Sequence, residues 1–275
     1  MISAIQKQQD GTIQLTITIP ASEVEKVRKE VVAEMVKATE LPGFRKGKAP
    51  QKLVEEKLDK EKIKEEVLKK VLPKFYTQAV TEHKLKPILN PKIHVQKLED
   101  GKDWQFIALT CEAPVVKLDS YKENIQKITT KSKIIVPGQE KQEPKLEDVV
   151  KALLESVSAQ IPAILIAQEA ERLLAQLLDD IKRLGLTLDQ YLASTQRTPE
   201  ALRAEYEKKV EGDLKLEFTL QRIAEEEKIT VSDKEIEEAI LKAKDENERK
   251  NLEQNKYLLA SILRQQKTLD FIKNL

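Results

Sequence analysis

The second half of the sequence, residues 146–275, constrains the fold most, because apolar residues recur there at helical spacing almost to the C-terminus. The whole chain has only seven glycines, and the breaks between the apolar runs carry helix start signals. Pro162 and the Thr198-Pro199 pair suit the first positions of helices. This half therefore predicts a mostly α-helical domain. The predicted helices cover about 146–157, 162–185, a short stretch around Tyr191, 199–228, 236–243 and 247–273, with capping boxes at Thr187/Gln190 and Ser232/Glu235.

The first 115 residues carry two predicted β-hairpins, one near each end, with helical sequence between them. Asp10-Gly11 and Asp100-Gly101 supply the hairpin turns, because glycine accepts positive φ. Pro73 lies inside the helical sequence and should bend or break a helix there. The order of elements describes an α+β domain with an antiparallel sheet and a projecting helical loop. The predicted strands are Ile2–Gln8, Thr12–Ile19, Lys92–Leu98 and Trp104–Cys111.

The connection between the first two predicted helices is rich in glycine, proline and cations. It reads Gly43-Phe44-Arg45-Lys46-Gly47-Lys48-Ala49-Pro50, and no acid occurs between Glu40 and Glu55. Arginine and lysine pair with phosphates or carboxylates, an aromatic ring fills an apolar pocket, and glycine allows close backbone approach. Taken alone, such a loop is more often a solvated connector than a binding site. If it binds, its chemistry suits a polyanion or an acidic protein surface.

Composition excludes several classes of protein. The net charge is +1, so contact with nucleic acid would need a local patch. Cys111 is the single cysteine, which excludes an intrachain disulfide and a multi-thiolate zinc site, and no catalytic arrangement can be assembled around His83 and His94. Gly43 and Gly47 match neither the P-loop nor the dinucleotide pattern, so we expect no nucleotide, other cofactor or metal. No apolar run approaches a membrane span, no secretory signal opens the chain, and a cytoplasmic location is expected.

The N-terminal pattern resembles the ribosome-binding domain of the bacterial trigger factor family. The similarity lies in the string from Gly43 to Pro50 and in the hairpin, helix, loop, helices, hairpin order around it. In that family the loop docks beside the polypeptide exit tunnel and contacts a ribosomal protein and ribosomal RNA. By position, the resemblance implies that the ribosome-binding residues are Gly43, Phe44, Arg45, Lys46, Gly47 and Lys48.

The C-terminal half is similar to the helical chaperone domain of the same family. Pro162–Glu169, Gly185–Leu192, Thr198–Leu202 and Ile229–Ile236 carry the similarity. Family members use this domain as a cradle that shields nascent or unfolded polypeptides, and the resemblance implies the same partners here. Exposed apolar patches would bind such chains weakly and without fixed register. Most candidate residues should nevertheless be helix-packing core; the candidates are Leu186, Leu188, Tyr191, Leu258, Leu259, Ile262 and Leu263.

The polar segment 116–145 is expected to be an extended linker arm. Full-length family members carry an FKBP-like peptidyl-prolyl isomerase domain at this place. Only residues 137–145 separate the last strand-like stretch from the helical half, and Tyr121 is the one aromatic residue from Val115 to Glu147. The sequence therefore resembles a trigger factor without the isomerase domain. No catalytic residue and no enzymatic activity are expected.

Together these patterns predict an elongated molecule of two domains, an α+β domain over 1–115 and a helical domain over 146–275, joined by the linker 116–145. The predicted function is that of an ATP-independent chaperone that docks at the ribosomal exit tunnel and shields emerging chains. Its partners would be the ribosome and unfolded polypeptides, with no membrane, and a homodimer is expected if the free protein follows some relatives. Two alternatives stay open: an RNA-binding module that uses the Arg45–Lys48 loop, and a helical scaffold without chaperone activity.

Overall fold

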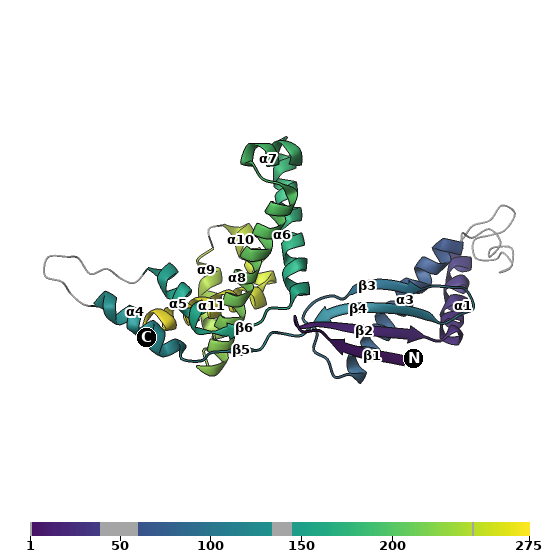
Figure 1. Cartoon of the computed structure of the whole chain (residues 1–275), viewed down its shortest axis with the longest axis horizontal. Helices are drawn as coiled ribbons and strands as arrows, with labels where there is room; N and C mark the ends of the chain where they lie inside the picture. Colours follow the sequence, from purple (N-terminus) through teal and green to yellow (C-terminus); the bar gives the residue numbers. More distant parts are fainter. Residues whose placement is uncertain (1, 39–59, 134–144, 244) are drawn as a thin grey trace. The chain divides into compact units, whose positions relative to one another are not determined.

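The computed structural model describes residues 2–38, 60–133, 145–243 and 245–275 (Figure 1). The chain divides into two compact units: an N-terminal unit of Met1–Ala113 with Pro162–Ile164, and a C-terminal unit of Pro114–Ile161 with Leu165–Leu275. The first unit combines a sheet with helices and the second is largely helical. The predicted fold class of each half is confirmed.

Four strands make the sheet of the N-terminal unit: β1 (Ile2–Lys7), β2 (Thr12–Ile19), β3 (Lys92–Lys97) and β4 (Trp104–Cys111). Their order is β1-β2-β4-β3, and every pairing is antiparallel. Both predicted hairpins are therefore confirmed, and the central β2–β4 pair joins them. The hairpin turns require glycine, because Gly11 and Gly101 have φ values of +84° and +73°.

Two long helices, α1 (Ala21–Ala38) and α3 (Lys60–Glu82), pack on one face of this sheet. Every second residue of β2 from Ile13 to Ile19 is buried, as expected for a strand with one face in the core. The buried residues of α3 recur every four positions, so one stripe of the helix faces the sheet. These residues are Ile63, Val67, Val71, Phe75 and Ala79.

Of the two outcomes predicted at Pro73, a bend or a break, the break is excluded, because α3 continues through this residue. Val71 and Phe75, on either side of Pro73, are buried in the core and hold the helix against the sheet. Proline removes one backbone donor, and its carbonyl still accepts a hydrogen bond of 2.8 Å from the Thr77 hydroxyl. Tertiary packing has outweighed the local cost of proline.

The elements of the C-terminal unit are, in chain order, β5 (Val116–Lys117), α4 (Tyr121–Lys133), α5 (Leu146–Ser156), β6 (Ser158–Ala159), α6 (Ala163–Arg183), α7 (Leu188–Thr195), α8 (Pro199–Glu226), α9 (Asp233–Leu241), α10 (Glu246–Gln254) and α11 (Lys256–Lys273). One core joins α4, α5, α8 and α11. Its fully buried side chains include Tyr121, Ile125, Leu153, Ile223 and Ile272.

Much of the segment 116–145 differs from the extended linker that the sequence predicted. Residues 121–133 form α4, and β5 pairs with β6 in a two-stranded sheet. Tyr121 and Ile125 lie one helical turn apart, so both side chains reach the core from the same face of α4. The Tyr121 hydroxyl also donates a hydrogen bond of 3.2 Å to Glu227, the residue that follows α8. Residues 134–144 of the predicted linker lie outside the described residues.

The predicted helix starts of the C-terminal unit are largely confirmed. Reciprocal capping boxes form at Thr187 and Ser232, and the Thr198 side chain caps α8 with proline at the next position. The single helix expected over 247–273 is instead two helices, α10 and α11, which meet at Asn255. The Asn255 side chain donates to its own preceding turn, a hydrogen bond that competes with a continuous helix. Among the described helices, none is long and apolar enough to cross a membrane.

Candidate functional site

The predicted ribosome-binding residues, Gly43, Phe44, Arg45, Lys46, Gly47 and Lys48, lie outside the described residues, so their role stays a prediction. The structure does describe α1 and α3, between which they lie in the chain. Lys70 on α3 pairs with Glu34 on α1 at 2.6 Å, and Lys74 pairs with Glu23 at 3.9 Å. These ion pairs add to the buried contact between the helices, which gives the loop a defined base.

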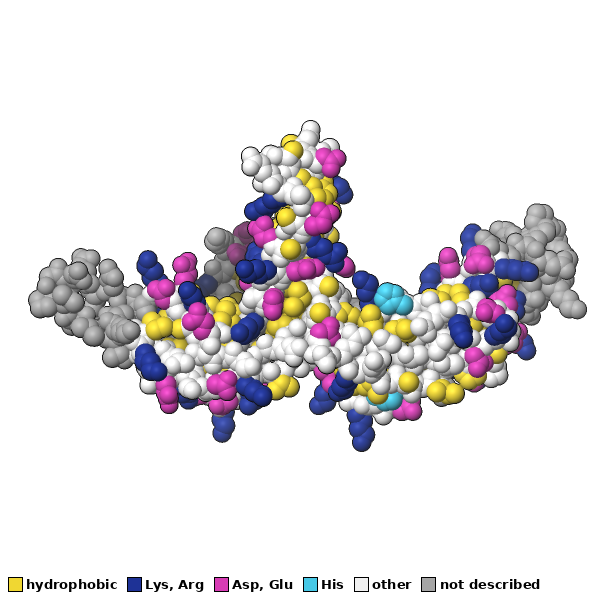
Figure 2. Space-filling model, in the orientation of Figure 1, with side chains coloured by type: hydrophobic (Ala, Val, Ile, Leu, Met, Phe, Trp, Pro, Cys, Tyr) yellow, Lys and Arg dark blue, Asp and Glu magenta, His cyan; other side chains and the backbone are white. Residues whose placement is uncertain are grey.

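In the C-terminal unit, α6, α7 and α8 form a helical arm with α7 at its tip (Figure 1). An ion pair of 3.7 Å between Glu171 and Arg203 joins α6 to α8. Both helices also bury apolar side chains, among them Ala170 on α6 and Val210 on α8. Figure 2 shows apolar side chains of the arm lying between charged ones on the face turned to the viewer.

Three leucines are exposed at the arm tip: Leu184, Leu186 and Leu188 are 76%, 43% and 36% exposed. We call these three residues the tip leucines. Their exposure follows from the backbone, because α6 ends at Arg183, Gly185 turns the chain with φ of +75°, and α7 begins at Leu188. The Leu186 amide donates to the carbonyl of Ile181 at 3.1 Å, which fixes this turn. The tip therefore combines a hydrogen-bonded turn with three exposed leucines.

A second group of exposed apolar side chains lies on α9 and α11. Tyr257 is 92% exposed and Leu258 is 60% exposed, and both lie in the first turn of α11. Leu241, at the end of α9, and Ile262, one turn after Leu258, are exposed as well. The opposite side of α11 is buried, with Leu259, Thr268 and Ile272 in the interior.

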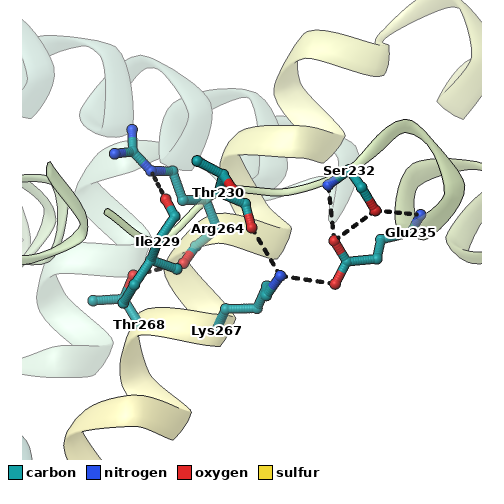
Figure 3. A network of polar contacts seen from close by, with 7 residues as sticks. All are labelled: Ile229, Thr230, Ser232, Glu235, Arg264, Lys267 and Thr268. Atoms are coloured by element: carbon teal, nitrogen blue, oxygen red, sulfur yellow. Dashed lines mark hydrogen bonds and ion pairs between the residues drawn. The ribbon is translucent and has the colours of Figure 1, made fainter. Parts of the chain in front are cut away.

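Polar contacts fix the segment between α8 and α9 against α11 (Figure 3). Lys267 of α11 donates to the Thr230 carbonyl and to the Glu235 carboxylate, both at 2.8 Å. The other carboxylate oxygen of Glu235 accepts from the Ser232 amide at 2.8 Å and from its hydroxyl at 2.9 Å. The hydrogen bond from Lys267, followed by those from Ser232, lowers the pKa of Glu235 to about 2. The network therefore holds Glu235 as a carboxylate at neutral pH.

The structure sorts the apolar candidates that the sequence could not separate. Leu186, Leu188, Leu258 and Ile262 are exposed, Tyr191 and Leu263 are half-buried, and Leu259 is buried. Sequence reasoning missed Leu184, Leu241 and Tyr257. A signal was available for them, because each lies at or beside a helix end, where neighbouring turns cover fewer side chains.

One contact resembles catalytic chemistry and has another explanation. The Ser3 hydroxyl lies 3.0 Å from Nε2 of His83, and it donates its hydrogen to Glu82 at 2.7 Å. Since a hydroxyl has one hydrogen, His83 must donate to the Ser3 oxygen and does not act as its base. Burial raises the pKa of the Cys111 thiol to about 11, so it is not a nucleophile at neutral pH. Among the described residues no group of three or more metal-ligating side chains comes together.

Two protein-family models match the chain. The model described as bacterial trigger factor protein (TF) matches residues 1–149, and the model described as bacterial trigger factor protein (TF) C-terminus matches residues 117–274. The chain therefore belongs to the bacterial trigger factor family. Because the two matches overlap, the N-terminal and C-terminal modules follow one another directly, without the isomerase domain between them.

Curated relatives and a solved structure agree with this family. The trigger factors of Staphylococcus epidermidis (strain ATCC 35984) and Staphylococcus aureus (strain Newman) are each 34% identical to the chain over 122 residues. The match covers 44% of this chain and only 28% of each relative. A solved structure described as "Promiscuous Substrate Recognition in Folding and Assembly Activities of the Trigger Factor Chaperone" matches with a TM-score of 0.67 at 14% identity, over 100% of this chain and 99% of that one. At that identity the likeness shows a common fold.

Proposed function

We propose that the chain is an ATP-independent molecular chaperone that holds nascent or unfolded polypeptides on its C-terminal unit. The observation that carries the proposal is the match of both trigger-factor models, in series, over nearly the whole chain. The solved protein of the same fold is described as a chaperone with promiscuous substrate recognition. A chaperone that recognises many different substrates needs an exposed apolar surface that can bind polypeptides of many sequences.

The tip leucines supply such a surface. Exposed leucines close together remove apolar area from water when an unfolded chain covers them, which stabilises the complex by about 25 cal/mol per Å². The last turn of α6 pairs its own charges, Lys182 with Asp179 and Arg183 with Asp180, each at 3.8 Å. These exposed ion pairs contribute little to the stability of the fold. Because each pair joins one cation to one anion, their charges cancel. Contact with a client should therefore depend on apolar area more than on charge.

We also propose that the Gly43–Lys48 loop docks this chaperone at the polypeptide exit tunnel of the cytoplasmic ribosome, on a ribosomal protein and ribosomal RNA. The match of the N-terminal family model over residues 1–149, which include the loop, supports this role. The loop offers three cations for phosphates or carboxylates and one aromatic ring for an apolar pocket. The base formed by α1 and α3 would let the loop bind without moving the sheet.

The proposed activity is binding without catalysis. The overlapping family matches support this, because they leave no interval for an isomerase domain between the modules. The Ser3 and His83 contact supports it too, since its hydrogen bonds point away from nucleophile activation. Acceleration of prolyl isomerisation in a short peptide by the purified chain would contradict this part of the proposal.

The test separates docking from client binding in one pair of assays. A Phe44→Ala, Arg45→Ala, Lys46→Ala variant should lose cosedimentation with ribosomes and keep its suppression of aggregation of a denatured protein. Unchanged ribosome binding would refute the docking role of the loop. An RNA-binding module would bind free RNA tightly and leave aggregation unchanged. A helical scaffold would bind neither ribosomes nor unfolded protein, and the same assays with sedimentation would show whether the free chain dimerises.

A further inference from the structure

A cleft lies in the C-terminal unit between α8, the segment before α9 and the first half of α11. Its volume is about 480 Å³. Apolar side chains from all three elements line it, among them Leu220, Ala224 and Val231. Tyr257 and Glu217, both exposed, also contribute to the lining, so the cleft is open to solvent. Polar side chains line the cleft as well, among them Gln221, Ser261 and Gln265, and its volume falls in the range of ligand sites.

Arg264 lines the cleft and is held at only one of its nitrogens. Its Nε donates to the Ile229 carbonyl at 2.9 Å, and its backbone carbonyl accepts from the Thr268 hydroxyl at 2.7 Å. The two terminal nitrogens form no hydrogen bond or ion pair with any residue that the structure describes. Figure 3 shows the guanidinium turned away from the Glu235 and Lys267 pair. Those two nitrogens form the fork that matches a carboxylate.

No other charged residue of the described chain near the cleft pairs with the terminal nitrogens of Arg264. Lys267 is occupied by Glu235 and by the Thr230 carbonyl. Glu217 is the one acid in the lining, and it forms no ion pair with any described residue. Glu217 is exposed, so water screens its charge, whereas Arg264 is half-buried and gains more from a partner. The geometry therefore favours an anion at Arg264.

We propose that this cleft binds an acidic side chain of an unfolded polypeptide together with the apolar side chain beside it. The carboxylate pairs with the terminal nitrogens of Arg264, and the apolar neighbour packs on the accessible lining residues Val231, Ala260 and Tyr257. Tyr257 offers an exposed ring that covers the bound segment. The inference rests on the proposed chaperone function and adds a sequence preference to it: segments in which glutamate or aspartate stands next to large apolar residues.

An internal acidic side chain suits the cleft better than the carboxylate of a chain end. An unfolded polypeptide offers many acidic side chains and a single C-terminus. The lining includes exposed residues such as Gln221, Tyr257 and Ser261, so the cleft is open to solvent and a chain can pass across it without ending there. The carboxylate needs to reach one half-buried guanidinium, which a glutamate side chain does from a backbone at the surface.

The test measures fluorescence anisotropy of three labelled decapeptides with the full chain. The first has leucine, glutamate and leucine at its centre with both ends blocked, the second has glutamine in place of glutamate, and the third is the glutamine peptide with a free C-terminal carboxylate. The wild type should bind the glutamate peptide about tenfold more tightly than its glutamine twin, as expected for one charge-assisted bidentate pair. Arg264→Gln should abolish this difference between the two blocked peptides.

Two further variants serve as controls. Arg264→Lys keeps the charge without the fork and should retain a smaller preference for the glutamate peptide, which also serves if Arg264→Gln fails to fold. Glu217→Gln removes the nearby acid and should raise affinity for the glutamate peptide about twofold. Circular dichroism melting of each variant checks that the unit is intact.

Three results would overturn the inference. These are equal wild-type affinities for the blocked peptides, a preference that survives in Arg264→Gln, or tighter binding of the free-ended glutamine peptide alone, which would assign the cleft to chain ends. A chain that binds no peptide at the cleft yet suppresses aggregation would reject this inference and leave the chaperone proposal standing. A chain that fails in both assays would reject both.

Discussion

The two units of the molecule distribute their apolar residues differently. The N-terminal unit buries one side of its sheet under α1 and α3, and its exposed large apolar side chains, such as Ile2 and Val95, are scattered. The C-terminal unit also has a core, but it exposes large apolar side chains in groups, at the arm tip and along α9 and α11. Scattered exposed apolar residues are ordinary, and clustered ones indicate an interaction surface. The comparison therefore suggests that client binding belongs to the C-terminal unit.

The largest effect should come from truncating the N-terminal core. Leu15 is fully buried in β2, and Leu15→Ala should lower the free energy of unfolding by about 2–5 kcal/mol through lost burial and a residual cavity. Trp104 is the only tryptophan and lies in this unit, so its fluorescence in a denaturant titration reports unfolding there.

Ile223→Ala is the matched control, because Ile223 is equally buried in the C-terminal core. It should shift the helical transition seen by far-ultraviolet circular dichroism and leave the tryptophan midpoint in place. If either variant moved both transitions equally, the two units would unfold as one, and the comparison between them would lose its basis.

A smaller effect is expected at the start of α9. Ser232 caps the helix and donates to Glu235, so Ser232→Ala should cost about 1 kcal/mol of stability. Circular dichroism during urea unfolding measures this loss. Ser261→Ala, an exposed serine on α11, is the control and should change stability by less than about 0.5 kcal/mol. Equal losses in both variants would argue against the capping role.

The contacts of Glu235 predict that the stability of the fold depends on pH. The folded-state pKa is about 2, below the ordinary value of an unfolded chain, so the carboxylate stabilises the fold fully above that ordinary value and loses this contribution as pH falls toward 2. The difference in unfolding midpoint between wild type and Glu235→Gln should therefore be larger at pH 7 than at pH 3. Glu237→Gln, on the same helix, serves as the control. A gap that widened toward low pH would contradict the assignment.

Local signals in the sequence predicted much of the fold. The hairpins at Gly11 and Gly101 follow from the need for positive φ, and the caps at Thr187 and Ser232 follow from backbone donors that only a nearby side chain can satisfy. Where the sequence misled, tertiary contacts decided. Pro73 stays inside a helix because the sheet holds its neighbours.

Residues 121–133 also adopt a structure that local sequence signals did not predict. Their polar composition concealed a helix, because among its described side chains only two apolar ones, Tyr121 and Ile125, enter the core, beside the buried Thr129. The surface that receives them comes from distant helices. The candidate site depends even more on such contacts. Leu258 and Leu259 are neighbours in sequence, yet one is exposed and the other buried, which only the packing of α11 determines. The cleft at Arg264 likewise combines three elements that no local pattern joins.

The smallest effect on stability should accompany the largest effect on function. A Leu184→Ser, Leu186→Ser, Leu188→Ser variant changes exposed side chains, so the free energy of unfolding should move by only about 0.5 kcal/mol. Val95→Ser is the matched control, since Val95 is 52% exposed in the N-terminal unit.

Suppression of aggregation by this triple variant tests the central claim most directly, with light scattering of a denatured protein diluted into buffer at equal chaperone concentration. The tip leucines should carry much of the client contact, so the triple variant should suppress aggregation several-fold less than the wild type, and Val95→Ser should match the wild type. Full suppression by a folded triple variant would contradict the assignment of client binding to the arm of the C-terminal unit.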